Sequence, residues 1–183
     1  VFFDFAAAFP SILHDYLLLI ISSVGLPQGV VHALEAFYTL CVSFVAVGNQ
    51  VLFFTWMLSG VIQGCPLSGS LFALALDPIL QLMSRTLLNS GSGQIRACAD
   101  DLGAAMPSIE GLRLLQPIFQ KTELATGLGL KPSKCNLVPL APFSLQRIET
   151  IRDWLCAHLP SWSSFNIVGC AKYLGFYMGP EAS

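Results

Sequence analysis

Two adjacent aspartates, Asp100 and Asp101, separate two short apolar runs, residues 95–99 and 102–106. Apolar runs on both sides of a short polar pair are typical of a β-hairpin, which here carries two carboxylates at its tip. A third carboxylate, Asp4, ends another apolar run at the start of the chain. Carboxylates at the ends of buried strands are costly unless they are paired, and a bound divalent cation commonly relieves that cost. The pattern therefore predicts a metal site suited to phosphate chemistry.

The length and composition limit the classes of protein to which this chain can belong. Its 183 residues suit one domain, residues 1–183, with a full hydrophobic core. Hydrophobic residues make up 54% of the sequence and charged residues 11%, an unusually apolar balance for a free-standing domain. The net charge of −2 lacks the basic excess of most nucleic-acid-binding domains. Because an apolar strand begins at the first residue, without an initiating Met, we expect a fragment of a longer polyprotein.

A membrane-spanning protein is the alternative that such an apolar composition raises. The most apolar stretches, residues 16–24, 37–47 and 51–58, are each shorter than the roughly 20 residues that a spanning helix needs. No basic segment precedes an apolar run, so no signal peptide is expected. Six cysteines are scattered without a C-x-x-C pair, which is typical of reduced thiols. We therefore expect an intracellular protein without a membrane partner.

Hydrophobic periodicity, turn residues and helix caps predict an alternation of hairpins and long helices. Ser11 is expected to cap the first helix, with Asp15 in its first turn. This mixture predicts an α+β fold, in which an antiparallel sheet has helices packed on one face. The expected strands and hairpins cover residues 1–5, 41–57, 94–106, 135–138 and 172–178, and the expected helices cover residues 12–23, 29–39, 71–88, 108–125 and 144–158.

Five segments resemble, in order, the five palm motifs of reverse transcriptases. In the first segment, Asp4 is followed five positions later by the aromatic Phe9. In the third, Ala99-Asp100-Asp101 is similar to the Ala-Asp-Asp core of the family. The sequences of these motifs most resemble those of non-LTR (LINE-like) retrotransposons. The resemblance implies a polymerase palm-type sheet, here without fingers or thumb. The five segments are residues 3–9, 60–72, 99–101, 127–135 and 172–175.

The resemblance implies catalytic roles for particular residues. Asp4 and Asp100 would be the ligands of two Mg²⁺ ions, for which Mn²⁺ could substitute. Asp101 would be a weaker metal ligand or an electrostatic helper beside them. Lys134 would act as a general acid that protonates or neutralises the pyrophosphate leaving group. Without the motifs, the aspartates would be solvated residues of a hairpin tip, and Lys134 would be a solvated surface lysine.

The resemblance also implies a set of nucleotide-binding residues. Phe9 would pack under the sugar and exclude a 2′-hydroxyl group, whereas RNA-templated RNA polymerases usually carry a small or polar residue there. Phe9 could instead be an ordinary core aromatic, and Gln63 an ordinary turn residue. The set comprises Phe5, Ala6, Ala7 and Ala8, whose backbone would face the triphosphate, together with Phe9, Gln63 and Gly64.

The last motif implies a primer grip, a hairpin of Tyr173, Leu174 and Gly175 that holds the primer end. The alternative is that Tyr173 and Leu174 are core residues at a strand turn. Three positions in other motifs depart from the family pattern. Cys98 stands where Tyr or Phe is usual, Gly69 stands where Pro is common, and Lys131 stands where Asn is more usual. None of these departures removes a metal ligand.

The activity that the resemblance implies is RNA-directed DNA synthesis, with transfer of a nucleotide from a dNTP to a primer 3′-hydroxyl. The implied partners are an RNA template, a DNA primer, the dNTP and the rest of a polyprotein, with fingers, thumb and endonuclease. A nuclear location follows from the resemblance alone. Two other functions stay open: a decayed or domesticated palm module that binds nucleic acid or partners without catalysis, and an RNA-templated RNA polymerase.

Overall fold

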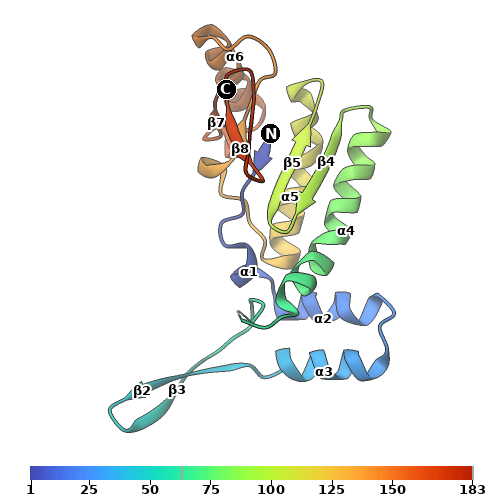
Figure 1. The fold of residues 1–183 in the computed structure, drawn as a ribbon, viewed down its shortest axis with the longest axis vertical. Coiled ribbons are helices and arrows are strands. Elements are labelled where there is room, and N and C mark those ends of the chain that lie inside the picture. The colour runs from blue at the N-terminus through green and yellow to red at the C-terminus, as the bar shows by residue number, and fades with distance from the viewer. Residues whose placement is uncertain (63, 183) are drawn as a thin grey trace.

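A five-stranded sheet forms the centre of the molecule (Figure 1). The computed structural model describes residues 1–62 and 64–182. The strands of the sheet are β1 (Phe2–Phe3), β4 (Gln94–Cys98), β5 (Asp101–Ala105), β6 (Asn136–Leu137) and β7 (Asn166–Ile167). Their spatial order is β4-β5-β1-β6-β7. β1 is therefore an internal strand, and it pairs antiparallel with both β5 and β6.

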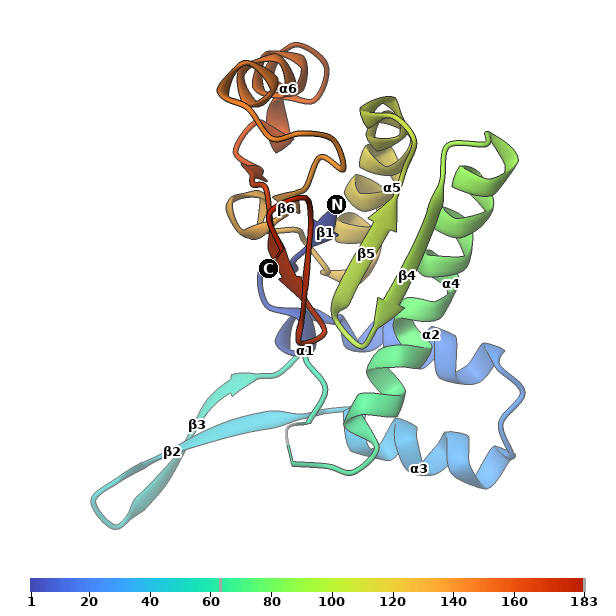
Figure 2. The ribbon, with the colours of Figure 1, turned by 45° about the horizontal axis from the view of Figure 1, so that its top comes forward.

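Two long helices, α4 (Ser68–Asn89) and α5 (Leu112–Thr126), cover one face of the sheet (Figure 2). Each is amphipathic and buries one apolar stripe. Side chains alternate along a strand, so Phe3 and Leu102 point into the core while their neighbours point to the opposite face. The ring of Phe3 packs against Phe119 of α5 with a centroid distance of 4.9 Å. The core thus lies between the sheet and these helices, which leaves the other face available for polar residues.

A smaller group of elements lies at one end of the sheet (Figures 1 and 2). It contains the helices α1 (Ala8–Ser11), α2 (His14–Ser23) and α3 (Gln28–Tyr38). A two-stranded hairpin follows α3 and projects away from the rest of the molecule in both views. Its strands are β2 (Val42–Val47) and β3 (Gln50–Trp56), joined by a tight turn at Gly48 and Asn49.

The last third of the chain completes the sheet and adds a second small hairpin. The helix α6 (Leu145–His158) begins at Ser144, whose hydroxyl accepts a hydrogen bond from the Arg147 N–H. The hairpin consists of β8 (Ala171–Tyr173) and β9 (Phe176–Met178). It lies on the sheet face opposite α4 and α5, because Tyr173 stacks on Phe2. Three 3₁₀ turns connect these parts: η1 (Ile109–Gly111), η2 (Pro132–Lys134) and η3 (Pro160–Trp162).

The predicted α+β architecture, both predicted hairpins and all the predicted helices are confirmed. Three details are wrong. The sheet is not purely antiparallel, because β6 and β7 run parallel, as the intervening helix α6 allows. Ser11 ends α1 and does not cap α2, whose start is held by a hydrogen bond from the His14 N–H to the Leu58 carbonyl oxygen. The expected single strand at residues 172–178 is two strands, because Leu174 and Gly175 reverse the chain.

In the part of the chain that the structure describes, α4 is the one helix long and apolar enough to cross a membrane, judged by length and composition. The apolar stretches that the sequence singled out do not include it, because Asp77 and Arg85 interrupt its pattern. α4 packs against β4 and α5. A core helix of a soluble protein meets the same criterion, so α4 is weak support for a membrane span.

Candidate active site at one end of the sheet

Three neighbouring strands meet at one end of the sheet, and each carries a predicted catalytic residue there. β1 is followed directly by Asp4, and β5 begins at Asp101. β6 begins at Asn136, two positions after Lys134. Because β1 is antiparallel to both neighbours, the end of β1 lies beside the beginnings of β5 and β6. The fold therefore brings Asp4, Asp101 and Lys134 to the same end of the sheet.

The strand register also fixes which face the carboxylates occupy. Phe3 lies opposite Leu102, so the register carried one residue further places Asp4 across from Asp101. Phe3 and Leu102 are both buried in the core. Since side chains alternate along a strand, Asp4 and Asp101 point to the face that α4 and α5 do not cover.

The hairpin tip that carries Asp100 has a conformation unusual for its sequence. Cys98 pairs with Asp101, so Ala99 and Asp100 form a two-residue loop. A two-residue loop whose first residue has positive φ favours glycine at that position. Ala99 has a φ of 52°, in the left-handed region that costs an alanine about 1–2 kcal/mol. Backbone strain of this kind is common at functional sites.

The three aspartates influence one another electrostatically. Burial raises the pKa of Asp101, and the negative charges of Asp100 and Asp4 raise this pKa further. Asp100 and Asp101 are exposed and Asp4 is only half-buried. The expectation that these carboxylates are buried is therefore wrong, because the strands are short and end at an open face. Partial desolvation of Asp101 and the like charges of Asp100 and Asp4 together make the arrangement costly.

The donor set decides which cation the site can hold. Within residues 1–62 and 64–182, no three His, Cys, Asp or Glu side chains converge closely enough to hold a metal ion by themselves. Mg²⁺ does not require such a cage, because it commonly binds one or two carboxylates and keeps water and substrate phosphates as its other ligands. Hard carboxylate oxygens on an open face fit Mg²⁺ better than Zn²⁺, which prefers His and Cys.

The backbone of Asp4 is held on both sides by the segment that contains Lys134. The Lys131 N–H donates to the Asp4 carbonyl oxygen at 2.8 Å, and the Asp4 N–H donates to the Cys135 Sγ at 3.3 Å. Burial raises the pKa of the Cys135 thiol to about 11, which keeps it neutral. The sequence identified Cys135 only as a reduced thiol, although its place directly after Lys134 in the fourth motif was a signal of this contact.

The predicted nucleotide-binding segment leads from Asp4 into α1. Phe5 and Ala8 are buried, whereas Ala6 and Ala7 are exposed. The Ala6 N–H donates to the Gly129 carbonyl oxygen at 2.8 Å, so this amide is not available to a phosphate, which corrects the prediction for that residue.

Phe9 is half-buried, and its ring stacks on Phe72 of α4. The two ring centroids lie 4.5 Å apart with an interplanar angle of 16°. This contact fixes the ring of Phe9 and is compatible with either predicted role. Sequence reasoning did not single out Phe72, although it belongs to the second motif.

The predicted hairpin of Tyr173, Leu174 and Gly175 is confirmed as a structure, and its grip on a primer stays a prediction. Tyr173 pairs with Phe176 across the hairpin, and Leu174 and Gly175 form the turn with φ values of 49° and 89°. The Tyr173 Oη donates to the backbone carbonyl oxygen of Asp101 at 3.3 Å. The hairpin thus reaches the strand that carries a candidate metal ligand.

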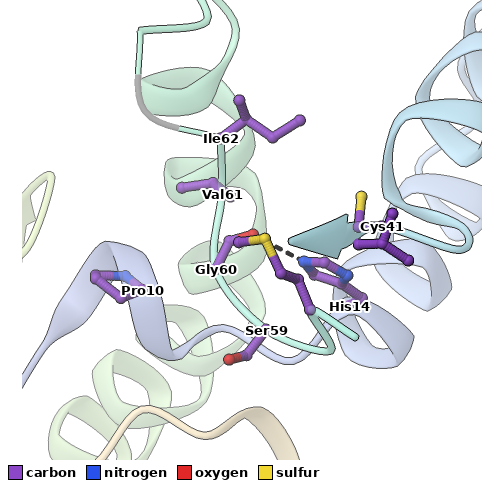
Figure 3. Close-up of a pocket in the computed structure, with 9 residues that line it drawn as sticks. Pro10, His14, Cys41, Ser59, Gly60, Val61 and Ile62 are labelled. Atoms are coloured by element: carbon purple, nitrogen blue, oxygen red, sulfur yellow. Dashed lines mark hydrogen bonds between the residues drawn. The ribbon is translucent and has the colours of Figure 1, made fainter. Parts of the chain in front are cut away.

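Gln63 lies outside the described residues, and Gly64 is exposed with a φ of 86°. The segment before them borders a cavity of about 490 Å³, lined by Pro10, Cys41, Met57 and Val61 among others (Figure 3). The buried His14 donates from Nε2 to the Gly60 carbonyl oxygen at 2.9 Å. This contact ties the start of α2 to the segment at Gly60, which is a structural role for His14.

Comparison with known proteins agrees with the geometry. The family described as "Reverse transcriptase (RNA-dependent DNA polymerase)" matches residues 1–178. The chain is 31% identical over 192 residues to the "Retrovirus-related Pol polyprotein from type-1 retrotransposable element R2" of Bradysia coprophila. That alignment covers 98% of this chain and 22% of the relative, so the chain spans about a fifth of that polyprotein. With a family match over nearly its whole length and a non-LTR element as a relative, the chain belongs to the reverse transcriptases, which are RNA-directed DNA polymerases.

Proposed function

We propose that this chain is the catalytic core of a reverse transcriptase that transfers a nucleotide from a dNTP to the 3′-hydroxyl group of a DNA primer on an RNA template. The observation that carries the proposal is the meeting of Asp4, Asp101 and Lys134 at the ends of three adjacent strands, with Asp100 in the adjoining loop. Carboxylates beside a lysine on an open face combine an anionic metal site with a cationic group. That combination suits phosphoryl transfer.

Each residue of the site has its own task in this proposal. Asp4, Asp100 and Asp101 hold the divalent ions, Mg²⁺ or Mn²⁺, through carboxylate oxygens. When bound, two such ions stabilise the charge on the attacking and leaving oxygens. Lys134 places its ammonium group near the pyrophosphate and donates a proton to it or neutralises its charge. The hydrogen bonds between Asp4 and the segment of Lys134 fix this arrangement before the substrate binds.

The catalytic role is tested with Asp100→Ala in the full-length protein, assayed by primer extension on an RNA template. We expect extension to fall by about a thousandfold or more, because the loss of a metal ligand removes several kcal/mol of transition-state stabilisation. Asp77→Ala is the matched control, since Asp77 is exposed on α4 and accepts a hydrogen bond from Gln81. Equal activity of Asp100→Ala and the parent protein would refute the proposal and favour a non-catalytic palm module.

The choice of DNA over RNA synthesis is tested at Phe9. Because Phe72 holds the ring of Phe9 in place, Phe9→Val removes a rigid group from the sugar position and is expected to raise ribonucleotide incorporation about tenfold or more. Phe37→Val, at an exposed aromatic of α3, is the control. Unchanged rejection of ribonucleotides by Phe9→Val would show that Phe9 is a core residue and not the sugar gate.

A further inference from the structure

The ring of Tyr173 rests on a seat formed by Phe2 and Gly103, which pair across β1 and β5. The rings of Tyr173 and Phe2 are stacked, with centroids 4.8 Å apart and an interplanar angle of 14°. A Cβ atom on Gly103 would lie 3.1 Å from Cζ of Tyr173 and 3.3 Å from its Oη. A side chain at position 103 would therefore press against the ring, which would have to move by a few tenths of an ångström.

The backbone does not require glycine at position 103. Gly103 lies within β5, pairs with Phe2 and Arg96, and is not among the residues with positive φ. A glycine inside a strand lowers strand stability and often marks the close approach of another group. The atoms nearest to the missing Cβ all belong to Tyr173. The glycine at this position is therefore explained by the tyrosine that covers it.

The seat matters because of how the β8–β9 hairpin is attached. The hairpin forms a two-stranded sheet of its own, and among the described residues no strand pairing joins it to the five-stranded sheet. Its position over that sheet therefore depends on contacts such as the Tyr173 ring stack and the hydrogen bond to the Asp101 carbonyl oxygen. Tyr173 directly precedes the turn at Leu174 and Gly175. The distance between the Tyr173 ring and the sheet consequently affects where the turn lies relative to Asp101.

We propose that Gly103 is a positioning residue, which seats Tyr173 and thereby sets the distance between the primer-holding hairpin and the catalytic aspartates. This inference rests on the proposed function, because the primer is the substrate that the hairpin would hold. Gly103 itself contacts no substrate. A methyl group at this position requires the Tyr173 ring to shift by a few tenths of an ångström. That shift changes the position of the hairpin turn, so the primer end is held less well.

The test is a double-mutant cycle in primer extension with the full-length protein. Gly103→Ala is expected to raise KM for primer-template about tenfold with kcat within about twofold, since a methyl group must displace the ring. Tyr173→Ala removes the ring, so Gly103→Ala added to it should cause no further change. Gly29→Ala is the matched control, because a Cβ there would meet nothing within 4 Å. An equal rise in KM in both backgrounds would mean that Gly103 acts on folding alone and would overturn the proposal.

A second measurement does not depend on activity. Lys172 is exposed and directly precedes Tyr173, so trypsin cleavage after Lys172 reports how firmly the hairpin is seated. Cleavage should be several-fold faster in Gly103→Ala and Tyr173→Ala, and unchanged in Gly29→Ala. If the parent protein extends no primer, the proposed function fails while this assay still tests the seat. If trypsin cleaved Gly103→Ala at the same rate as the parent protein, the proposal that Gly103 seats Tyr173 would be wrong, whatever the activity.

Discussion

Ala99, at the tip of the hairpin that carries the aspartates, has a backbone conformation that a glycine adopts without penalty. We predict that Ala99→Gly raises the free energy of unfolding by about 0.5–1 kcal/mol, because relief of the left-handed strain exceeds the added entropy of the unfolded chain. Urea unfolding measures this change. Ala97→Gly, in the preceding strand β4, is the control and should lower stability. A loss of stability in both variants would contradict the strain at Ala99.

The ionised form of the Asp101 carboxyl group lowers the stability of the folded protein. Burial and the charges of Asp100 and Asp4 raise its pKa in the folded protein, so the fold holds this proton more tightly than the unfolded chain does. Stability from this group is therefore present below the unfolded pKa and is lost as the pH rises through the raised folded pKa. We predict that Asp101→Asn raises Tm at neutral pH in EDTA while it lowers primer extension. The measurement is Tm at a series of pH values from acidic to neutral. A Tm of Asp101→Asn below that of the parent protein at neutral pH would contradict the prediction.

At the residue scale, the sequence could identify the aspartates but not their surroundings. The hairpin at Asp100 was predictable because apolar runs flank a short loop, which is a local pattern. The contact of Asp4 with Cys135 joins residues 131 positions apart, so only their places in the first and fourth motifs, and not a local pattern, could indicate it. The seat of Tyr173 on Gly103 is long-range in the same way. The clustering of the site residues came from the family resemblance, because spacing alone does not fix which strands are neighbours.

At the scale of elements, the β2–β3 hairpin receives the least support from the rest of the molecule. Both strands were predictable from their Val- and Phe-rich runs around a Gly-Asn turn. The sequence contains no Asp, Glu, Lys or Arg between Glu35 and Asp77. Side chains of the hairpin are widely exposed, including Val51 at 71% and Phe54 at 68%. An exposed apolar hairpin of this kind promotes self-association.

We predict that Val51→Lys combined with Phe54→Lys reduces self-association without a loss of thermal stability. The two added charges repel other copies of the hairpin, and neither side chain contributes to the core. Light scattering and Tm measure the two effects. Leu124→Lys is the control, because Leu124 is 85% exposed but lies on α5, outside the hairpin. Equal scattering by the double variant and the parent protein would show that another surface drives association.

Two elements show where prediction from sequence stops. β7 was not predicted because it has only two residues and pairs with β6, from which the helix α6 separates it in the sequence. The turn between β8 and β9 was not predicted from propensity because it places Leu174, an apolar residue, at positive φ. In both cases tertiary contacts determine the structure more strongly than local preference does.

At the scale of the whole molecule, β1 holds the sheet together. It pairs with β5 on one side and β6 on the other, and Asp4 is bound by the segment before β6.

We predict that replacing residues 42–56 by a short Gly-Ser linker preserves cooperative unfolding in urea. Removal of residues 131–183 should abolish it, because β1 then loses one of its two partners. If the variant without residues 131–183 still unfolded cooperatively, pairing of β1 with β5 alone would be sufficient for a stable sheet.

The position of β1 inside the sheet has a consequence for biosynthesis. This strand leaves the ribosome well before Gly103 and Asn136, which lie opposite Phe2 in the folded sheet. At ordinary elongation rates the nascent chain waits on the order of ten seconds for its second neighbour. Throughout that interval the apolar residues of β1 and the charge-free β2–β3 hairpin are accessible to chaperones and to other nascent chains.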